Sequence, residues 1–237
     1  MKLSNNTFRR LILATILPLS AIFCATAQLV AHFPMIAEEG KIKETQTDRT
    51  FKIQGKFDAE NIPGAEGQAL RLDGYTSHIN AQINAQALNG SSFTFTLWCA
   101  IESYPMMNND GAVNSYTYLA GNLNETTRSG FAFLLSAQGD YSFEYYAAGW
   151  PVKVTVQATD KLPRYEWNHL AAVIDIHRDE ILLYRNGQIV SAFNGVPTPA
   201  SVGGDDFVIG KSFEDIKTGL FLMNTINGAI DDIRIYN

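Results

Sequence analysis

The sequence contains only two cysteines, Cys24 and Cys99. Cys24 lies in an N-terminal apolar segment that we expect to be removed, so one cysteine remains and no internal disulfide can form. The fold must therefore be held together by its hydrophobic core. In the run FTFTLWCAI, Cys99 shares a face with Phe93, Phe95, Leu97 and Ile101. We predict a small buried hydrophobic residue there rather than a nucleophile.

Charged residues are also scarce, and their balance is acidic. Only 18% of residues are charged, and 24 acidic side chains against 18 basic ones give a net charge of −6. Loss of the N-terminal segment removes three cations (Lys2, Arg9 and Arg10) and no acid, which takes this net charge of −6 to −9. Phosphate backbones repel such a chain, and no cluster of Lys and Arg offsets this locally. We therefore expect no nucleic-acid partner.

Long apolar runs are missing after residue 27. Before it, the three cations precede an apolar region from Leu11 to Cys24, and Ala25-Thr26-Ala27 supplies a small-residue cleavage pattern. We predict a signal peptide at 1–27, and hence a secreted, periplasmic or cell-surface protein with no membrane span after cleavage. The alternative is an uncleaved anchor, for which the run is short. Lipoprotein processing at Cys24 is disfavoured by the bulky Ile22-Phe23 before it.

Helical periodicity is scarce, whereas alternation of apolar and polar residues is common. The pair Asn186-Gly187 lies between two alternating runs, which is the strongest short-range signal of a β-hairpin. The segment 38–50 is polar, and we expect a loop. The predicted strands cover 29–36, 51–57, 69–72, 77–83, 92–103, 115–122, 130–137, 141–147, 152–158, 167–177, 180–186, 188–193, 206–210 and 227–236. Many short strands bounded by turn residues predict an all-β fold of two antiparallel sheets.

Four segments carry a family resemblance. WNHLAAVIDIHRDEILLYRNG (167–187) resembles the W-x-H-[LV]-A and L-x-L-Y-x-N-G motifs of laminin-G-like, or concanavalin A-like, jelly-roll domains. The other three are GQALRLDGYTSHI (67–79), SFTFTLWCAI (92–101) and the ending FVIG…INGAIDDIRIYN. Their order and spacing imply one jelly-roll domain over residues 28–237.

Within this family, NIPGAEGQALRLDGY and LPRYEWNHL are most similar to the N-terminal accessory domain of secreted bacterial fructan hydrolases, of the glycoside hydrolase family 32 type. The resemblance implies a non-catalytic, lectin-like carbohydrate-recognition module that is accessory to polysaccharide breakdown. Its implied partners are a glycan, such as a fructan or another polysaccharide, and a glycoside hydrolase catalytic domain. Two alternatives are a structural domain that stabilises such a catalytic domain and a protein–protein adhesion module.

We predict no catalytic residue. Some jelly-roll relatives hydrolyse glucans with three acids at E-x-D-x-x-E spacing on one strand. The nearest match, Asp175 to Glu180, lacks the first glutamate and ends at a predicted turn. His169 and His177 share a face with Asp175, but one strand does not supply the three or four converging ligands that zinc needs. The Asn-Asp-Pro nucleophile motif of the fructan hydrolases is absent as well.

The resemblance also implies one structural calcium ion where the first and last strands meet. Ca²⁺ takes several oxygen ligands, often carboxylates together with backbone carbonyls. Asp231 stands at the position of an acid in the family's final strand, and Asp73 is expected nearby. The alternative is that Asp231 and Asp232 cap strand ends or pair with Arg234.

Sugar binding needs aromatic rings for stacking and polar groups around them. Trp150 lies in a predicted turn, and one of Tyr145 and Tyr146 must point outward because strand neighbours face opposite ways. Tyr104 and Tyr116 flank an Asn/Asp-rich loop, where recognition residues are common. Asn122 and Arg128 are candidate hydrogen-bonding groups, and packing is the alternative role for the whole set. We interpret Trp98 and Trp167 as framework residues buried beneath loops.

Overall fold

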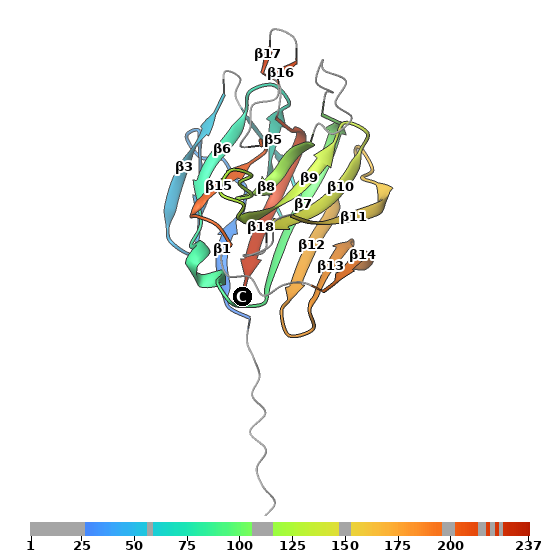
Figure 1. Cartoon of the computed structure of the whole chain (residues 1–237). Coiled ribbons are helices and arrows are strands. Elements are labelled where there is room, and N and C mark those ends of the chain that lie inside the picture. Colours follow the sequence, from blue (N-terminus) through green and yellow to red (C-terminus); the bar gives the residue numbers. More distant parts are fainter. Residues whose placement is uncertain are drawn as a thin grey trace, which may run out of the picture.

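Two antiparallel sheets pack face to face in the computed structural model (Figure 1). The structure describes residues 27–55, 59–105, 116–146, 153–195, 202–212, 217–218, 221–222 and 225–237. The strand order of the first sheet is β14 (Gln188–Asn194), β13 (Glu180–Arg185), β12 (Asn168–Asp175), β7 (Phe93–Ser103), β18 (Asn227–Tyr236), β5 (Gln68–Asp73) and β4 (Glu60–Pro63). Strand β1 (Leu29–Phe33) pairs with the C-terminal half of β18.

The second sheet covers the inner face of the first. Its strand order is β11 (Val154–Lys161), β10 (Asp140–Tyr146), β9 (Gly130–Ser136), β8 (Tyr116–Gly121), β15 (Asp206–Ile209), β6 (His78–Gln82), β3 (Arg49–Gln54) and β2 (Lys41–Glu44). The short strands β16 (Lys217–Thr218) and β17 (Phe221–Leu222) form a separate ladder. The predicted all-β sandwich of two antiparallel sheets is confirmed.

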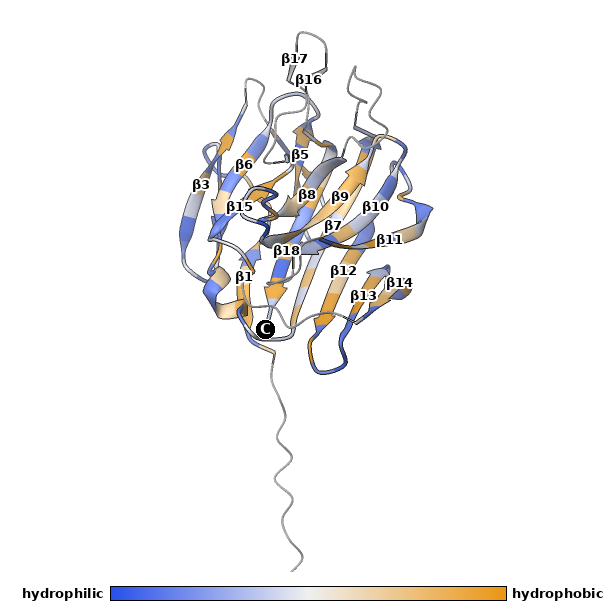
Figure 2. Ribbon diagram, in the orientation of Figure 1, coloured by the Kyte–Doolittle hydropathy of each residue, from blue (hydrophilic) through white to orange (hydrophobic). Residues whose placement is uncertain are grey.

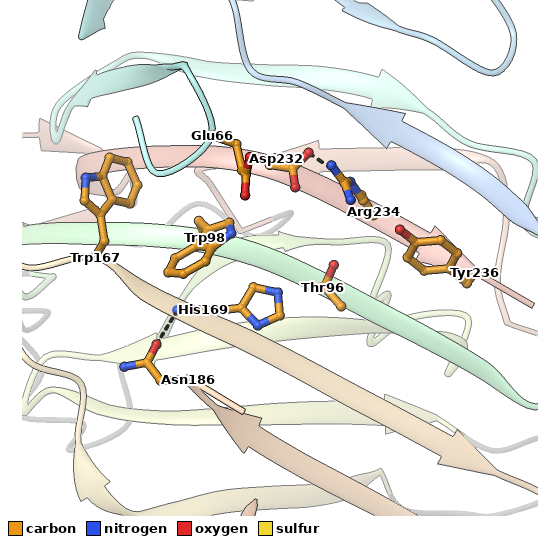
Figure 3. Close-up of a pocket in the computed structure, with 9 residues that line it drawn as sticks. All are labelled: Glu66, Thr96, Trp98, Trp167, His169, Asn186, Asp232, Arg234 and Tyr236. Carbon is orange, nitrogen blue, oxygen red and sulfur yellow. Dashed lines mark hydrogen bonds and ion pairs between the residues drawn. The ribbon is translucent and has the colours of Figure 1, made fainter. Parts of the chain in front are cut away.

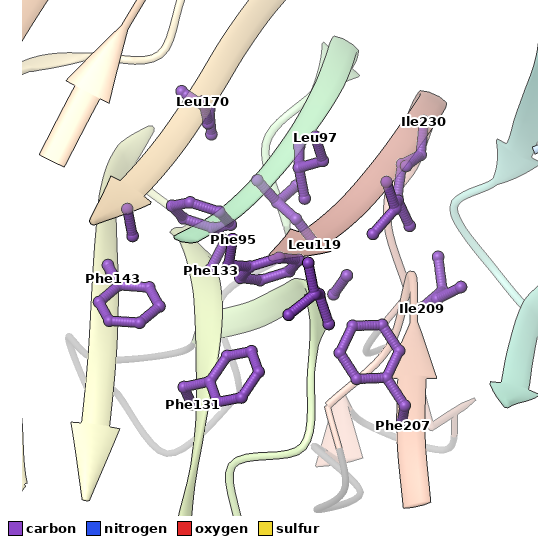
Figure 4. Close-up of a cluster of buried hydrophobic side chains, with 14 of the residues drawn as sticks. Phe95, Leu97, Leu119, Phe131, Phe133, Phe143, Leu170, Phe207, Ile209 and Ile230 are labelled. Atoms are coloured by element: carbon purple, nitrogen blue, oxygen red, sulfur yellow. The ribbon is translucent and has the colours of Figure 1, made fainter. Parts of the chain in front are cut away.

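The core lies between the sheets, and aromatic rings dominate its centre (Figure 4). Phe95 from the first sheet meets Phe131, Phe133 and Phe207 from the second, at ring-centroid distances of 5.3, 4.7 and 5.9 Å. Cys99 is fully buried in the same core, and burial raises the pKa of its thiol to about 12. The predicted burial of Cys99 as a small core residue is confirmed.

Alternation located most of the strands correctly. Each predicted segment contains a strand, and apolar and polar residues alternate along many of them (Figure 2). The predicted hairpin joins β13 to β14, where Asn186 and Gly187 have φ angles of 50° and 77°. Both residues tolerate this left-handed conformation better than most, which is why the pair marks the turn.

The loop predicted for residues 38–50 is wrong, because the segment contains β2 and its hairpin with β3. Strand β2 has one buried apolar residue, Ile42, and its other buried side chain is Glu44. The Glu44 carboxylate accepts hydrogen bonds from the backbone amides of His32, Gln46 and Thr47, at 2.7 to 2.9 Å. These bonds compensate the burial of a charge, so a polar residue takes an inward position that sequence patterns reserve for apolar ones.

Helical structure in the described part of the chain is limited to a 3-10 turn at Ala85–Leu88. No helix among the described residues has the length and apolar character needed to cross a membrane.

Candidate ligand-binding groove

A groove of about 700 Å³ lies on the outer face of the first sheet (Figure 3). Strands β7, β12 and β18 send alternate side chains to this face, because successive residues of a strand point in opposite directions. Thus Leu97 and Cys99 enter the core, whereas Trp98 between them lines the groove. The lining residues are Glu66, Thr96, Trp98, Trp167, His169, Asn186, Asp232, Arg234 and Tyr236.

Three aromatic groups give the groove its apolar surface. Trp98 and Trp167 are both partly exposed, so the prediction that they are buried beneath loops is wrong. The Trp98 ring lies 4.9 Å from the imidazole of His169, at an interplanar angle of 54°. Tyr236 lies further along β18 in the same groove. Sugar rings stack on side chains of this type.

The Asn186 side chain fixes one wall of the groove. Its Oδ1 accepts a hydrogen bond from the backbone amide of His169 at 2.8 Å, which ties the β13–β14 turn to β12 (Figure 3). Burial lowers the pKa of the His169 imidazole below its usual value. This imidazole is therefore neutral at neutral pH and can offer one donor and one acceptor.

A β-bulge in β18 shapes the charged side of the groove. Asp231 pairs with Trp98 and Arg234 with Thr96, so three steps on β18 oppose two on β7. Asp232 takes the strained position, with a φ of 46°. Bulges of this kind redirect side chains locally.

The bulge holds Asp232 between two basic side chains. Its Oδ1 accepts hydrogen bonds from Arg234 Nε at 3.0 Å and from His32 Nε2 at 2.9 Å. Burial tends to lower the pKa of the Arg234 guanidinium, but hydrogen bonding to Tyr236 and the charge of Asp232 raise it above its usual value. The polar side of the groove is thus a chain of contacting side chains from His32 to Tyr236.

Asp231 positions the turn that carries Glu66. The Glu66 amide donates to Asp231 Oδ2 at 2.8 Å, and burial raises the pKa of this carboxyl group. A Cβ at Gly64, in the same turn, would lie 2.5 Å from that oxygen, so the close approach requires glycine. Asp231 therefore sets the edge of the groove without lining it.

A second hollow of about 700 Å³ lies beside β2 and β3. Its lining residues are Pro34, Ile36, Glu38, Glu39, Lys41, Ile42, Lys43, Thr45 and Thr50, none of them aromatic. The groove on the first sheet is the better candidate for a sugar site, because it combines aromatic rings with hydrogen-bonding groups.

Three of the predicted sugar-binding residues lie on the other side of the molecule, at the outer face of the second sheet. Tyr146 is almost fully buried and donates a hydrogen bond to Glu125, whose carboxylate also pairs with Lys153 Nζ at 2.6 Å. Tyr116 is half-buried and packs against the small apolar cluster that contains Tyr146. Arg128 is exposed, and its charge acts on the Tyr146 hydroxyl. Both tyrosines therefore pack within the protein and do not present an open ring face to a ligand.

The remaining predicted residues have structural contacts. Tyr145 is fully buried in the main core, so neither it nor Tyr146 presents an exposed ring. Tyr104 donates a hydrogen bond from its hydroxyl to the Leu162 carbonyl at 2.8 Å, and Arg164 lies over its ring. Asn122 is buried between two strands and a loop. Trp150 lies outside the described residues, and its predicted role stays a prediction.

The structure does not bring Asp73 and Asp231 together. Asp73 pairs with Asn227, which lies four residues before Asp231 on β18. Asp73 Oδ1 accepts from the amides of Tyr75, Thr76 and Ser77, each at 2.8 Å, so this carboxylate closes a turn. Among the described residues, no group of three or more His, Cys, Asp or Glu could hold a metal ion. Asp73 and Asp231 therefore do not share one site, and the calcium ion stays a prediction, for which a higher melting temperature in the presence of Ca²⁺ would be the expected result.

The turn at Asp73 predicts a pH-dependent stability. Although burial opposes it, the three amides lower the pKa of Asp73 below its usual 3.8. A lowered folded-state pKa stabilises the fold above the unfolded value, and this contribution is lost as the pH falls through the folded value. Asp73→Asn should therefore lower the melting temperature at pH 7, and the difference should shrink below about pH 4. A difference that is equal at pH 3 and pH 7 would contradict this role.

Comparisons with known proteins agree with the fold. A model of the concanavalin A-like lectin/glucanases superfamily matches residues 73–237. Among curated protein sequences, none matches the chain.

Solved structures with the same fold have low sequence identity to this chain. Domain 4 of AbnA, a GH43 extracellular arabinanase from Geobacillus stearothermophilus solved with arabinotriose, has a TM-score of 0.63 at 18% identity, over 89% of this chain and 93% of that one. The binding domain of Paraclostridial Mosquitocidal Protein 1 has a TM-score of 0.60 at 17% identity, and the match covers 88% of this chain and 48% of that one. A Trypanosoma rangeli sialidase has a TM-score of 0.58 at 14% identity, and the match covers 88% of this chain and 30% of that one.

Proposed function

Because this chain belongs to the concanavalin A-like lectin/glucanases superfamily, we propose that it is a secreted, non-catalytic carbohydrate-recognition module. The groove on the first sheet is its binding site. We further propose that the module assists polysaccharide breakdown beside a glycoside hydrolase catalytic domain, with a fructan or another polysaccharide as ligand. Residues 1–27 would direct its export.

The observation that carries this proposal is the pairing of partly exposed tryptophans with fixed polar groups in one groove. Trp98 and Trp167 offer flat apolar surfaces, and Asp232 and Arg234 lie beside them. The bulge and the contacts from His32 hold these polar groups in place before a ligand arrives, which reduces the entropy lost on binding. The arabinanase domain of the same fold, solved with arabinotriose, supports a glycan as the ligand.

Two carboxylates line the groove, which raises the question of hydrolysis. A glycosidase needs one carboxyl group to donate a proton and a second to act as base or nucleophile. Asp232 is already engaged by Arg234 and His32, and Glu66 is exposed on a turn. We therefore expect binding without cleavage. Prolonged incubation with fructan, arabinan and glucan should release no reducing ends, and product formation that Glu66→Gln abolishes would contradict this.

The binding proposal is tested by titration with soluble oligosaccharides, monitored by tryptophan fluorescence and calorimetry. Trp98→Ala should weaken binding about tenfold, or about 1.4 kcal/mol, because it removes the central stacking surface. The matched control is Tyr75→Ala, which removes an exposed aromatic ring outside the groove and should change the affinity less than about twofold.

Trp150→Ala tests the alternative site, which the sequence predicts around Trp150. If it abolishes binding while Trp98→Ala leaves the affinity unchanged, the site lies elsewhere. If fructan, arabinan and other plant or host glycans all fail to bind the wild-type chain, the proposed function is wrong.

A further inference from the structure

The charges around the groove are mainly negative. Two carboxylates, Glu66 and Asp232, line it, and among the described residues that line it Arg234 is the one with a permanent positive charge. His169 is neutral at neutral pH because burial disfavours its charged form. His32 contacts Asp232 from β1 and is not among the residues that line the groove. A negatively charged ligand therefore finds no excess of positive charge here.

The Nε side of the Arg234 guanidinium is already paired within the protein. Proteins that recognise carboxylates commonly present both arms of an arginine fork to the ligand. In this groove Arg234 Nε donates to Asp232, and the guanidinium also bonds to Tyr236. The edge of the fork that includes Nε is therefore occupied, and a ligand contact must come from the remaining Nη donors, close to the Asp232 carboxylate.

The groove is longer than a single sugar ring. Tyr236 on β18 pairs with Thr94 on β7, and Thr94 lies four residues from Trp98 along β7. At about 3.3 Å per residue this is roughly 13 Å. Figure 3 shows the polar side chains of Asp232 and Arg234 along β18, on the way from the tryptophans to Tyr236.

We propose, as an extension that rests on the proposed function, that the groove takes a stretch of an uncharged glycan chain and excludes sialylated or uronic acid glycans. Glu66 and the neutral His169 accept hydrogen bonds from sugar hydroxyls, while the aromatic rings stack on successive sugar units. A ligand carboxylate would have to lose water next to two carboxylates of the same charge, which opposes binding.

The test uses the full chain and a matched pair of ligands: trigalacturonate and its fully methyl-esterified form, which has the same skeleton without charge. Arabinotriose, a fructose trisaccharide and the corresponding monosaccharides complete the panel. At least one neutral trisaccharide should bind about tenfold more tightly than its monosaccharide, and the ester should bind at least about tenfold more tightly than trigalacturonate. Glu66→Gln should narrow the gap between ester and acid about threefold, because it removes one carboxylate and keeps the shape of the side chain.

The outcomes separate the two proposals. Tight binding of trigalacturonate or sialyllactose that Trp98→Ala abolishes would overturn the exclusion of anionic glycans while supporting a sugar site in the groove. Equal affinities for a trisaccharide and its monosaccharide would overturn the chain-binding part alone. No binding of any sugar in the panel would overturn both proposals.

Discussion

Phe95→Ala is expected to lower the free energy of unfolding by about 3–5 kcal/mol. Phe95 is fully buried at the centre of the sandwich and meets three phenylalanines of the opposite sheet within 6 Å between ring centroids. Its removal takes away the contact surface of all three rings and leaves a cavity that the rigid sheets cannot close. Cys99 is a free thiol, so no disulfide cross-links the described part of the chain to offset this loss.

Urea unfolding followed by circular dichroism measures this effect. The matched control is Ile189→Ala on the edge strand β14, where the side chain is 57% exposed and a change within about 0.5 kcal/mol is expected. A Phe95→Ala variant as stable as Ile189→Ala would mean that the sheets do not pack as described.

Asn122→Ala is expected to destabilise the fold by about 2 kcal/mol or more, because it leaves two buried backbone groups, the Val202 carbonyl and the Phe131 amide, without their partner. The Asn122 amide donates to the carbonyls of Val202 and Gly204, at 2.7 and 3.1 Å, and its Oδ1 accepts from the Phe131 amide at 2.9 Å. One side chain thus joins β9 to the segment before β15. The sequence suggested a glycan contact for Asn122, whereas these three bonds make it a structural clamp.

Asn124→Ala is the matched control, because it shows how much of the loss in stability comes from the burial of the Asn122 contacts. Asn124 makes a similar side-chain contact, to the Thr127 amide at 2.9 Å, but in an exposed turn, so its loss should cost less than about 1 kcal/mol. Glycan affinity of the folded Asn122→Ala protein should remain within about twofold of wild type. A stable Asn122→Ala variant that has lost glycan binding would support the sequence-based role instead.

The sequence predicted the strands well because each strand carries its own signal. Alternation in β7 separates Phe95, Leu97 and Cys99 from their outward neighbours without any knowledge of the other strands. The same alternation could have located Trp98, since a residue next to Leu97 and Cys99 must face away from the core. The interpretation of Trp98 as a framework residue beneath a loop overlooks this signal, and with it part of the groove's apolar surface.

Other parts of the groove depend on pairs of strands, which one segment cannot reveal. The bulge at Asp232 is defined by how β18 pairs with β7, so β18 alone does not reveal it. The contact between His32 and Asp232 joins residues 200 positions apart. Similarly, Tyr146 does point away from the core as alternation requires, but its partner Glu125 comes from another part of the chain. Pattern gives the direction of a side chain, whereas its exposure depends on what covers it.

The most direct test of the central claim is to follow the indole N–H signals of the chain's three tryptophans by NMR during titration with a neutral trisaccharide that binds. Assignment comes from the three single Trp→Phe variants. If the groove is the binding site, the signals of Trp98 and Trp167 should shift with saturation, and that of Trp150 should stay in place. A shift confined to Trp150, with Trp98 and Trp167 unchanged, would contradict the assignment of the site to the first sheet.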